Sequence, residues 1–207
     1  MTTKNEKVIV IPAVMRGAAR VTVRGLSDLI VHKWSDKAEE EIRYKQAKGA
    51  KKAREKRDPR AEFEDCKYLD KQGRDCLLGA AIKGSIVGVA RNLDKVKMTD
   101  LRQQVFVRED LIPIAYESCE MRCDPVTVGN GKDLRYRPCY RNWSATFVIE
   151  WDAGKLEVNQ VLHLLQLAGY SVGIHEWRPE RSGNYGRFEL TEAVGASEPD
   201  TQPLAAE

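Results

Sequence analysis

The sequence predicts an α+β fold in which helices cover one face of an antiparallel β-sheet. Residues 144–151 alternate apolar side chains with Thr146, Val148 and Glu150, which is the period of a half-buried strand. Residues 156–168 place apolar side chains every three or four positions, as an amphipathic helix does, and Gly169 is expected to end this helix.

A second helix is expected over residues 80–92, where the small residues Gly84 and Gly88 lie along one side. Glycine inside a helix costs about 1 kcal/mol relative to alanine, so this pattern indicates close packing of the helix backbone or the approach of a ligand. Both helices have one apolar face to bury, and we expect both on the same side of the sheet.

Other strands are expected where apolar and β-branched residues are bounded by turn residues: 7–15, 19–25, 105–107, 111–116 and 187–190. Two hairpins are expected, one from residues 63–70 and 74–78, the other from residues 126–128 and 134–136 around Asn130-Gly131. Ser35 is a candidate cap for a helix that becomes strongly basic and stops near Asp58-Pro59.

The composition is that of an ordinary globular protein, with 42% hydrophobic and 31% charged residues. No apolar stretch approaches the roughly 20 residues that cross a bilayer, and residues 1–7 lack an apolar signal core. The five cysteines are irregularly spaced, which predicts reduced thiols and argues against a zinc site. We therefore expect a cytoplasmic protein without a membrane partner, a metal or a cofactor.

Charge is distributed unevenly along the chain. Residues 191–207 contain four acidic residues and no basic one, so the rest of the chain holds 34 basic against 27 acidic residues, a net charge of +7. We expect this acidic tail to be disordered. Residues 43–60 contain nine lysines and arginines against Glu55 and Asp58. Such clustering favours binding of a polyanion, although a solvated helix face explains a basic stretch equally well.

Two separate segments resemble a known family. In residues 156–190 a helix leads through a glycine-rich loop into a last strand, and Gly79, Lys83, Gly84 and Arg91 lie in an earlier Lys-Gly helix. These features are similar to the RAMP superfamily, the RNA-recognition-motif-like proteins of CRISPR effector complexes. The proline that the family places before the Lys-Gly helix is replaced here by Leu78-Gly79. Residues 135–143 followed by 173–188 look more like the stand-alone relatives from phages and other mobile elements.

The resemblance implies an RNA-recognition-motif (ferredoxin-like) antiparallel sheet built from residues 7–15, 19–25, 144–151 and 187–190. It also implies one domain over residues 1–190, with insertions at about 35–75 and 117–140 that carry the basic helix and a hairpin. Its implied function is coating of single-stranded RNA or DNA by side-by-side copies of the chain. The homo-oligomer would be a filament or a ring, and other effector-complex subunits are an open alternative.

The candidate contacts to nucleic acid are basic residues and one aromatic residue. In the glycine-rich loop they are Arg178, Arg181, Tyr185 and Arg187, with Tyr185 placed to stack a base and glycine N–H groups free to approach phosphates. The remaining candidates lie elsewhere: Lys83, Arg91, Arg135, Arg137, Arg141, Lys51, Lys52 and Arg54. Arg135, Arg137 and Arg141 are separated by even numbers of residues, so on an extended segment they would point to the same face and form one basic stripe. A tight turn in the core and ordinary surface charge are the alternative interpretations. Trp177, also in the loop, is either a contact to nucleic acid or a residue of the hydrophobic core.

We expect no catalytic residue, and the alternative function is that of a metal-independent RAMP-type endoribonuclease. Its candidate groups are Asp28, His32, His163 and His175. His175 would be exposed in the glycine-rich loop and would pair with Tyr185 as a general acid and base, whereas His163 would be packed in its helix. A third interpretation is a structural oligomer whose basic helix meets an acidic protein.

Overall fold

The computed structural model describes residues 14–33, 43, 57–129 and 131–197. The expected strand 7–15 therefore lies outside the described residues except for Val14 and Met15, which precede the first strand. The basic segment with Lys51, Lys52 and Arg54 also lies outside them.

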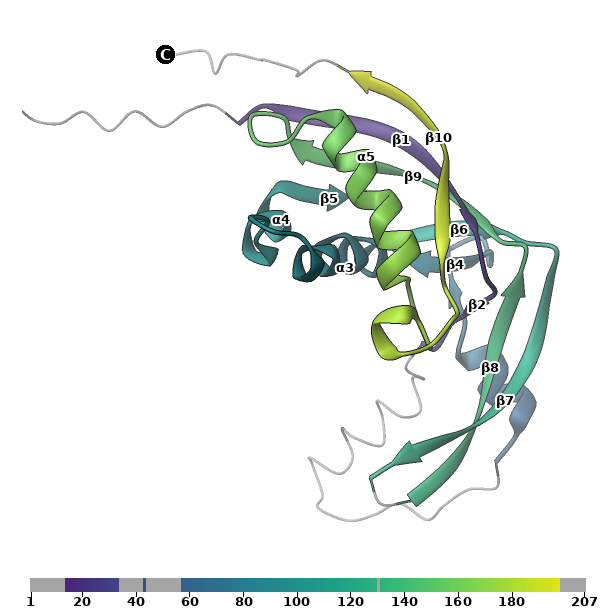
Figure 1. Cartoon of the computed structure of the whole chain (residues 1–207). Helices are drawn as coiled ribbons and strands as arrows, with labels where there is room; N and C mark the ends of the chain where they lie inside the picture. The colour runs from purple at the N-terminus through teal and green to yellow at the C-terminus, as the bar shows by residue number, and fades with distance from the viewer. Residues whose placement is uncertain (1–13, 34–42, 44–56, 130, 198–207) are drawn as a thin grey trace, which may run out of the picture.

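A large antiparallel sheet forms the centre of the fold (Figure 1), so the predicted α+β class is confirmed. Along the sheet the order is β10-β1-β9-β6-β4-β3, and β5 pairs with β9. Its strands are β1 (Arg16–Gly25), β3 (Tyr68–Leu69), β4 (Asp75–Leu78), β5 (Val105–Val107), β6 (Leu111–Ala115), β9 (Ser144–Asp152) and β10 (Phe188–Ser197). The predicted strands 19–25, 144–151 and 187–190 thus lie side by side, an arrangement compatible with a ferredoxin-like fold.

The two predicted helices and a further one gather on one face of this sheet (Figure 1), as predicted for residues 80–92 and 156–168. They are α3 (Gly79–Val89), which continues in a 3₁₀ turn (Ala90–Asn92), α4 (Met98–Gln104), which the sequence analysis did not predict, and α5 (Val158–Leu167). Buried side chains from α3, α5 and the strands, such as Ile86, Leu165 and Phe147, pack into one core. None of the helices in the described part of the chain is long and apolar enough to cross a lipid bilayer.

A second sheet forms an arm that projects from the main sheet (Figure 1). The arm is the long hairpin of β7 (Ser118–Val128) and β8 (Gly131–Arg141), and the short β2 (Leu29–Ile30) pairs with the base of β8. The hairpin predicted around residues 130–131 is therefore confirmed, and it is much longer than expected.

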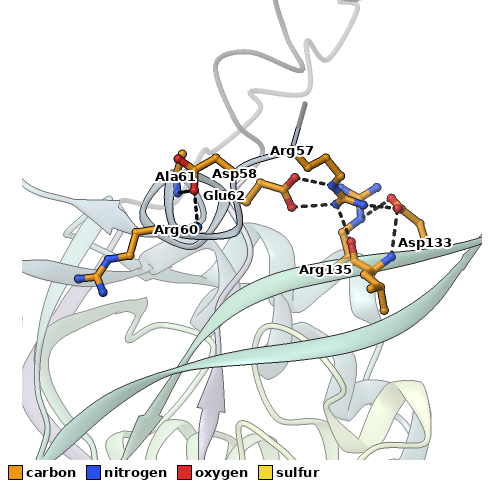
Figure 2. A network of polar contacts seen from close by, with 8 residues as sticks. Arg57, Asp58, Arg60, Ala61, Glu62, Asp133 and Arg135 are labelled. Atoms are coloured by element: carbon orange, nitrogen blue, oxygen red, sulfur yellow. Dashed lines mark hydrogen bonds and ion pairs between the residues drawn. The ribbon is translucent and has the colours of Figure 1, made fainter. Parts of the chain in front are cut away.

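Helix α2 (Pro59–Asp65) begins where the sequence predicted only the end of a helix. The Asp58 carboxylate accepts hydrogen bonds from the backbone N–H groups of Arg60 and Ala61 (Figure 2), and proline suits the first helical position. Residues 63–65 are consequently helical, and only Tyr68–Leu69 of the predicted strand 63–70 pair with β4. The basic helix that was predicted to stop near Asp58-Pro59 lies, apart from Arg43 and Arg57, outside the described residues.

Arg57 fastens the start of α2 to the arm (Figure 2). Its guanidinium donates to both carboxylate oxygens of Glu62, at 2.6 and 2.8 Å, and to Asp133 Oδ1 on β8 at 2.5 Å. The side chain of Arg60 points away from this network.

The start of the acidic tail is ordered, which corrects the prediction for residues 191–197. These residues continue β10, and Glu192 and Val194 pair with Thr22 and Arg20 of β1. The backbone pairing supplies the order that the local composition does not.

Candidate nucleic-acid interface

The glycine-rich loop, residues 173–187, follows α5 through a π turn (Ala168–Val172). The prediction that Gly169 caps the end of the helix is therefore wrong. Gly169 lies instead against β10, where an added Cβ would come within 2.1 Å of the Phe188 carbonyl oxygen. The turn passes into the loop at Gly173, whose φ of +71° favours glycine.

The glycine N–H groups of the loop are already used inside the protein, which corrects the expected phosphate cradle. Gly173 N–H donates to the Ala168 carbonyl at 2.8 Å, Gly183 N–H to Arg178 at 3.1 Å, and Gly186 N–H to Asp28 at 2.8 Å. These glycine N–H groups are therefore not free to contact a phosphate.

Four of the predicted arginines lie in or next to segments connected to the π turn, and we call them the basic cluster: Arg91, Arg178, Arg181 and Arg187. Helix α3, the 3₁₀ turn Pro179–Arg181 and β10 contact the π turn. Arg91 follows α3, Arg178 precedes the 3₁₀ turn that Arg181 ends, and Arg187 precedes β10.

Glu180 joins two members of the basic cluster. Arg178 donates from Nε and Nη2 to Glu180 Oε2, at 3.0 and 2.7 Å, and Arg91 donates from Nη1 to Oε1. Partial burial raises the pKa of Glu180, but the hydrogen bonds from Arg178 and Arg91 outweigh this effect and keep its pKa below the usual value. The carboxylate is thus ionised, and two cations share one anion.

The other two members form no ion pair with Glu180 in the described part of the chain. The guanidinium of Arg187 lies 4.7 Å from the ring centroid of Tyr170, which is 63% exposed. Arg181 is exposed at the surface. Lys83 is held elsewhere, with Nζ 4.1 Å from the ring centroid of Phe106 on β5. The structure therefore does not bring Lys83 and Arg91 to a common partner.

The glycines of α3 behave differently from one another. A Cβ on Gly88 would lie 3.0 Å from Val172 Cγ1 in the π turn, so this glycine permits the close packing that was predicted. Nothing lies within 4 Å of a Cβ on Gly84.

The predicted basic stripe on β8 is wrong at its centre. Arg137 is only 1% exposed, and its guanidinium donates to Asp124 on β7 and to Glu176 in the loop, both at 3.1 Å. Its neighbours are paired too, because Arg141 donates to Glu120 at 2.9 Å and Arg135 lies 3.5 Å from Asp133. Residue parity placed these arginines on one face correctly, but that face is turned inward at Arg137.

Tyr185 is engaged by the arm. Its hydroxyl accepts a hydrogen bond from Arg122 Nη1 at 2.9 Å, and the Arg122 guanidinium lies 4.9 Å from its ring centroid. Arg122 also donates to both Asp124 oxygens at 2.9 Å. Arg122 and Asp124 were not predicted from the sequence, and only the register of the hairpin, which sets Arg122 opposite Arg137, would have indicated them.

The histidines do not form the predicted catalytic pair. His175 Nε2 is buried without a hydrogen-bond partner among the described residues, and burial lowers its pKa to about 4, with Arg178 acting in the same direction. The imidazole is therefore neutral near pH 7, and it is not the exposed group that was expected. His163 is exposed on α5 rather than packed. Burial also lowers the pKa of His32. Within the described ranges, no three His, Cys, Asp or Glu side chains are arranged to hold a metal ion.

No family model and no curated protein matches the chain. Among solved structures, the chain is similar to Cmr6 from Pyrococcus furiosus, with 11% identity over 86% of this chain and 100% of that chain, and a TM-score of 0.43.

Proposed function

We propose that this chain binds single-stranded nucleic acid through phosphate contacts, without catalysing a reaction, and that copies of it coat the strand side by side. The observation that carries the proposal is the Arg91–Glu180–Arg178 arrangement at the base of the glycine-rich loop. Two guanidiniums carry up to ten N–H donors between them. One carboxylate leaves a net positive charge and several of these donors unused, which suits a phosphate oxygen.

The rest of the basic cluster extends this charge. Arg181 and Arg187 lie in or next to segments that contact the same turn, so a strand crossing the turn would meet several cations in succession. Each phosphate neutralised by such a cation releases a condensed counterion, and this release drives binding without regard to base sequence.

The topology supports a relationship to RAMP-type proteins of the RNA-recognition-motif class. Along the chain the central elements follow the order β1, α3, β6, β9, α5 and β10, while the sheet places β10, β1, β9 and β6 side by side. This is the order expected of a ferredoxin-like βαββαβ unit. The glycine-rich loop and the Lys-Gly helix then occupy the positions that the resemblance implies. The chain would act as a backbone subunit of a CRISPR-type complex or as a stand-alone phage or mobile-element factor.

The projecting arm supports the side-by-side assembly. It extends away from the main sheet (Figure 1) and exposes Met121 and Leu134, apolar residues that a neighbouring copy would cover. The position of His175 supports a binding role over the endoribonuclease alternative, because its Nε2 is buried and its lowered pKa keeps the imidazole neutral near pH 7.

The test is binding of labelled single-stranded RNA and DNA of increasing length, measured by gel shift over a range of salt concentrations. Arg91→Ala and Arg187→Ala should each weaken binding equally for all sequences and reduce the slope of log K against log salt by about 0.7. Arg102→Ala is the matched control, because it removes an exposed positive charge on α4 outside the basic cluster. Affinity that rises in steps with oligonucleotide length would reveal side-by-side assembly. A denaturing gel of the RNA would reveal cleavage.

Deletion of residues 198–207 provides a second control, because it removes acidic residues without shortening β10. Binding should stay the same or tighten. Normal binding by both cluster variants, together with loss of binding on this deletion, would place the site elsewhere and refute the proposal.

A further inference from the structure

Trp177 is an unusually placed aromatic residue in the glycine-rich loop. Its side chain is 37% exposed although indole is a large apolar group, and its backbone has a φ of +51°. A bulky residue in the left-handed region is strained, and His175 and Ser182 in the same loop share this conformation, with φ of +58° and +60°. Such strain persists only where the surroundings enforce it, and it clusters at functional sites.

The surroundings of Trp177 hold it firmly on one side. Arg122 and Arg137 face one another across the arm, so their side chains leave the same face of the hairpin. Their guanidiniums lie 5.5 and 5.7 Å from the indole centroid, within the range of a cation–π contact. The Trp177 carbonyl accepts the Tyr185 N–H at 3.0 Å, and Gly183 packs so closely that an added Cβ would lie 1.7 Å from this oxygen. The exposed part of the indole is therefore presented by a rigid frame.

Tyr185, the residue expected to stack a base, is less available. Its hydroxyl and its ring are both engaged by Arg122, and the residue is half-buried. Trp177 instead adjoins Arg178 of the basic cluster directly in the chain.

We propose that Trp177 is the base-stacking platform of this chain and takes one unpaired base of a strand whose phosphates lie on the basic cluster. This inference rests on the proposed function. Stacking on an indole is tolerant of base identity, because every base has a π-face, and a preorganised ring loses little entropy on binding. The platform would thus add affinity for single strands without adding sequence specificity.

The test separates base contacts from phosphate contacts. Trp177→Ala should weaken binding of a single strand about five- to hundredfold and leave the salt slope unchanged, whereas Trp177→Phe should retain much of the affinity. The unaltered protein should bind an oligonucleotide with an abasic stretch as weakly as Trp177→Ala binds the normal strand, a comparison that does not depend on how the variant folds. Phe106→Ala is the matched control, since it removes another exposed aromatic ring beside a cation, on β5 outside the basic cluster.

Fluorescence gives an independent measurement. Trp143 and Trp151 are buried, so in a Trp34→Phe background the emission that responds to the strand should come from Trp177 and should be quenched on binding. If the unaltered protein binds but Trp177→Ala, the abasic strand and the fluorescence all show no effect, this inference is overturned while the proposed function stands. If no strand binds the unaltered protein, both are overturned.

Discussion

Replacing Arg137 by methionine should destabilise the fold more than any exposed arginine replacement. The Arg137 side chain bridges two segments, because it donates to Asp124 in the arm and to Glu176 in the glycine-rich loop, each at 3.1 Å. It is 1% exposed, and its Nε is buried without a hydrogen-bond partner among the described residues. Methionine keeps the length and apolar character of the stem but removes the charge and all donors.

The magnitude follows from what is left behind. Removing one partner of a buried ion pair costs about 3–5 kcal/mol, because the other charge stays desolvated. Asp124, at 6% side-chain exposure, keeps Arg122 at 2.9 Å, and Glu176, at 39%, can regain water. Both circumstances favour the lower end, so the free energy of unfolding should fall by about 3 kcal/mol.

Urea unfolding followed by tryptophan fluorescence measures this loss. Arg141→Ala is the matched control in the same arm, because Arg141 and Glu120 form a pair with side chains 52% and 56% exposed, and it should cost about 0–1 kcal/mol. The reasoning is refuted if Arg137→Met costs no more than Arg141→Ala.

Two further predictions concern the loop and helix α3. Gly183→Ala should lower the free energy of unfolding by about 2–3 kcal/mol, because the added Cβ would collide with the Trp177 carbonyl. Gly84→Ala should raise the free energy of unfolding by about 0.5–1 kcal/mol, because the space around Gly84 is open and alanine favours the helix. Thermal unfolding of both variants checks the two predictions. Burial lowers the pKa of His175 from 6.5 to about 4, so between these values the unfolded chain binds more protons and stability is lost as the pH falls. His175→Asn, which tolerates positive φ, should flatten the stability profile between pH 6.5 and 4, and an unchanged difference between pH 7 and pH 4 would contradict the assignment.

The parts of the fold that sequence reasoning predicted are those that local patterns determine. Alternation along residues 144–151 predicted β9, and helical spacing along 156–168 predicted α5. The start of α2 was missed because Asp58-Pro59 is compatible both with the end of one helix and with the beginning of the next. The hydrogen bonds of the Asp58 side chain establish the beginning of α2, and they appear only in the structure.

Pairing between distant segments explains the other misses. Residues 191–197 have the composition of a disordered tail, yet β1 orders them because its outer edge supplies hydrogen-bond partners. For Arg137, parity predicted the face of the strand but not what covers it. Its cover comes from Asp124 on the neighbouring strand and from Glu176, 39 residues further along the chain.

The glycine-rich loop shows why glycine spacing alone does not establish a ligand site. The pattern predicts close approach to a backbone, and close approach occurs, but the approaching atoms are the protein's own: the Trp177 carbonyl at Gly183 and the Ile174 carbonyl at Gly186. The glycines therefore shape the loop rather than contact a phosphate, and the binding chemistry belongs to the side chains that the loop presents. It follows that Gly183→Ala should weaken nucleic-acid binding only to the extent that it displaces Trp177 and Arg178, whereas Gly84→Ala should leave binding intact.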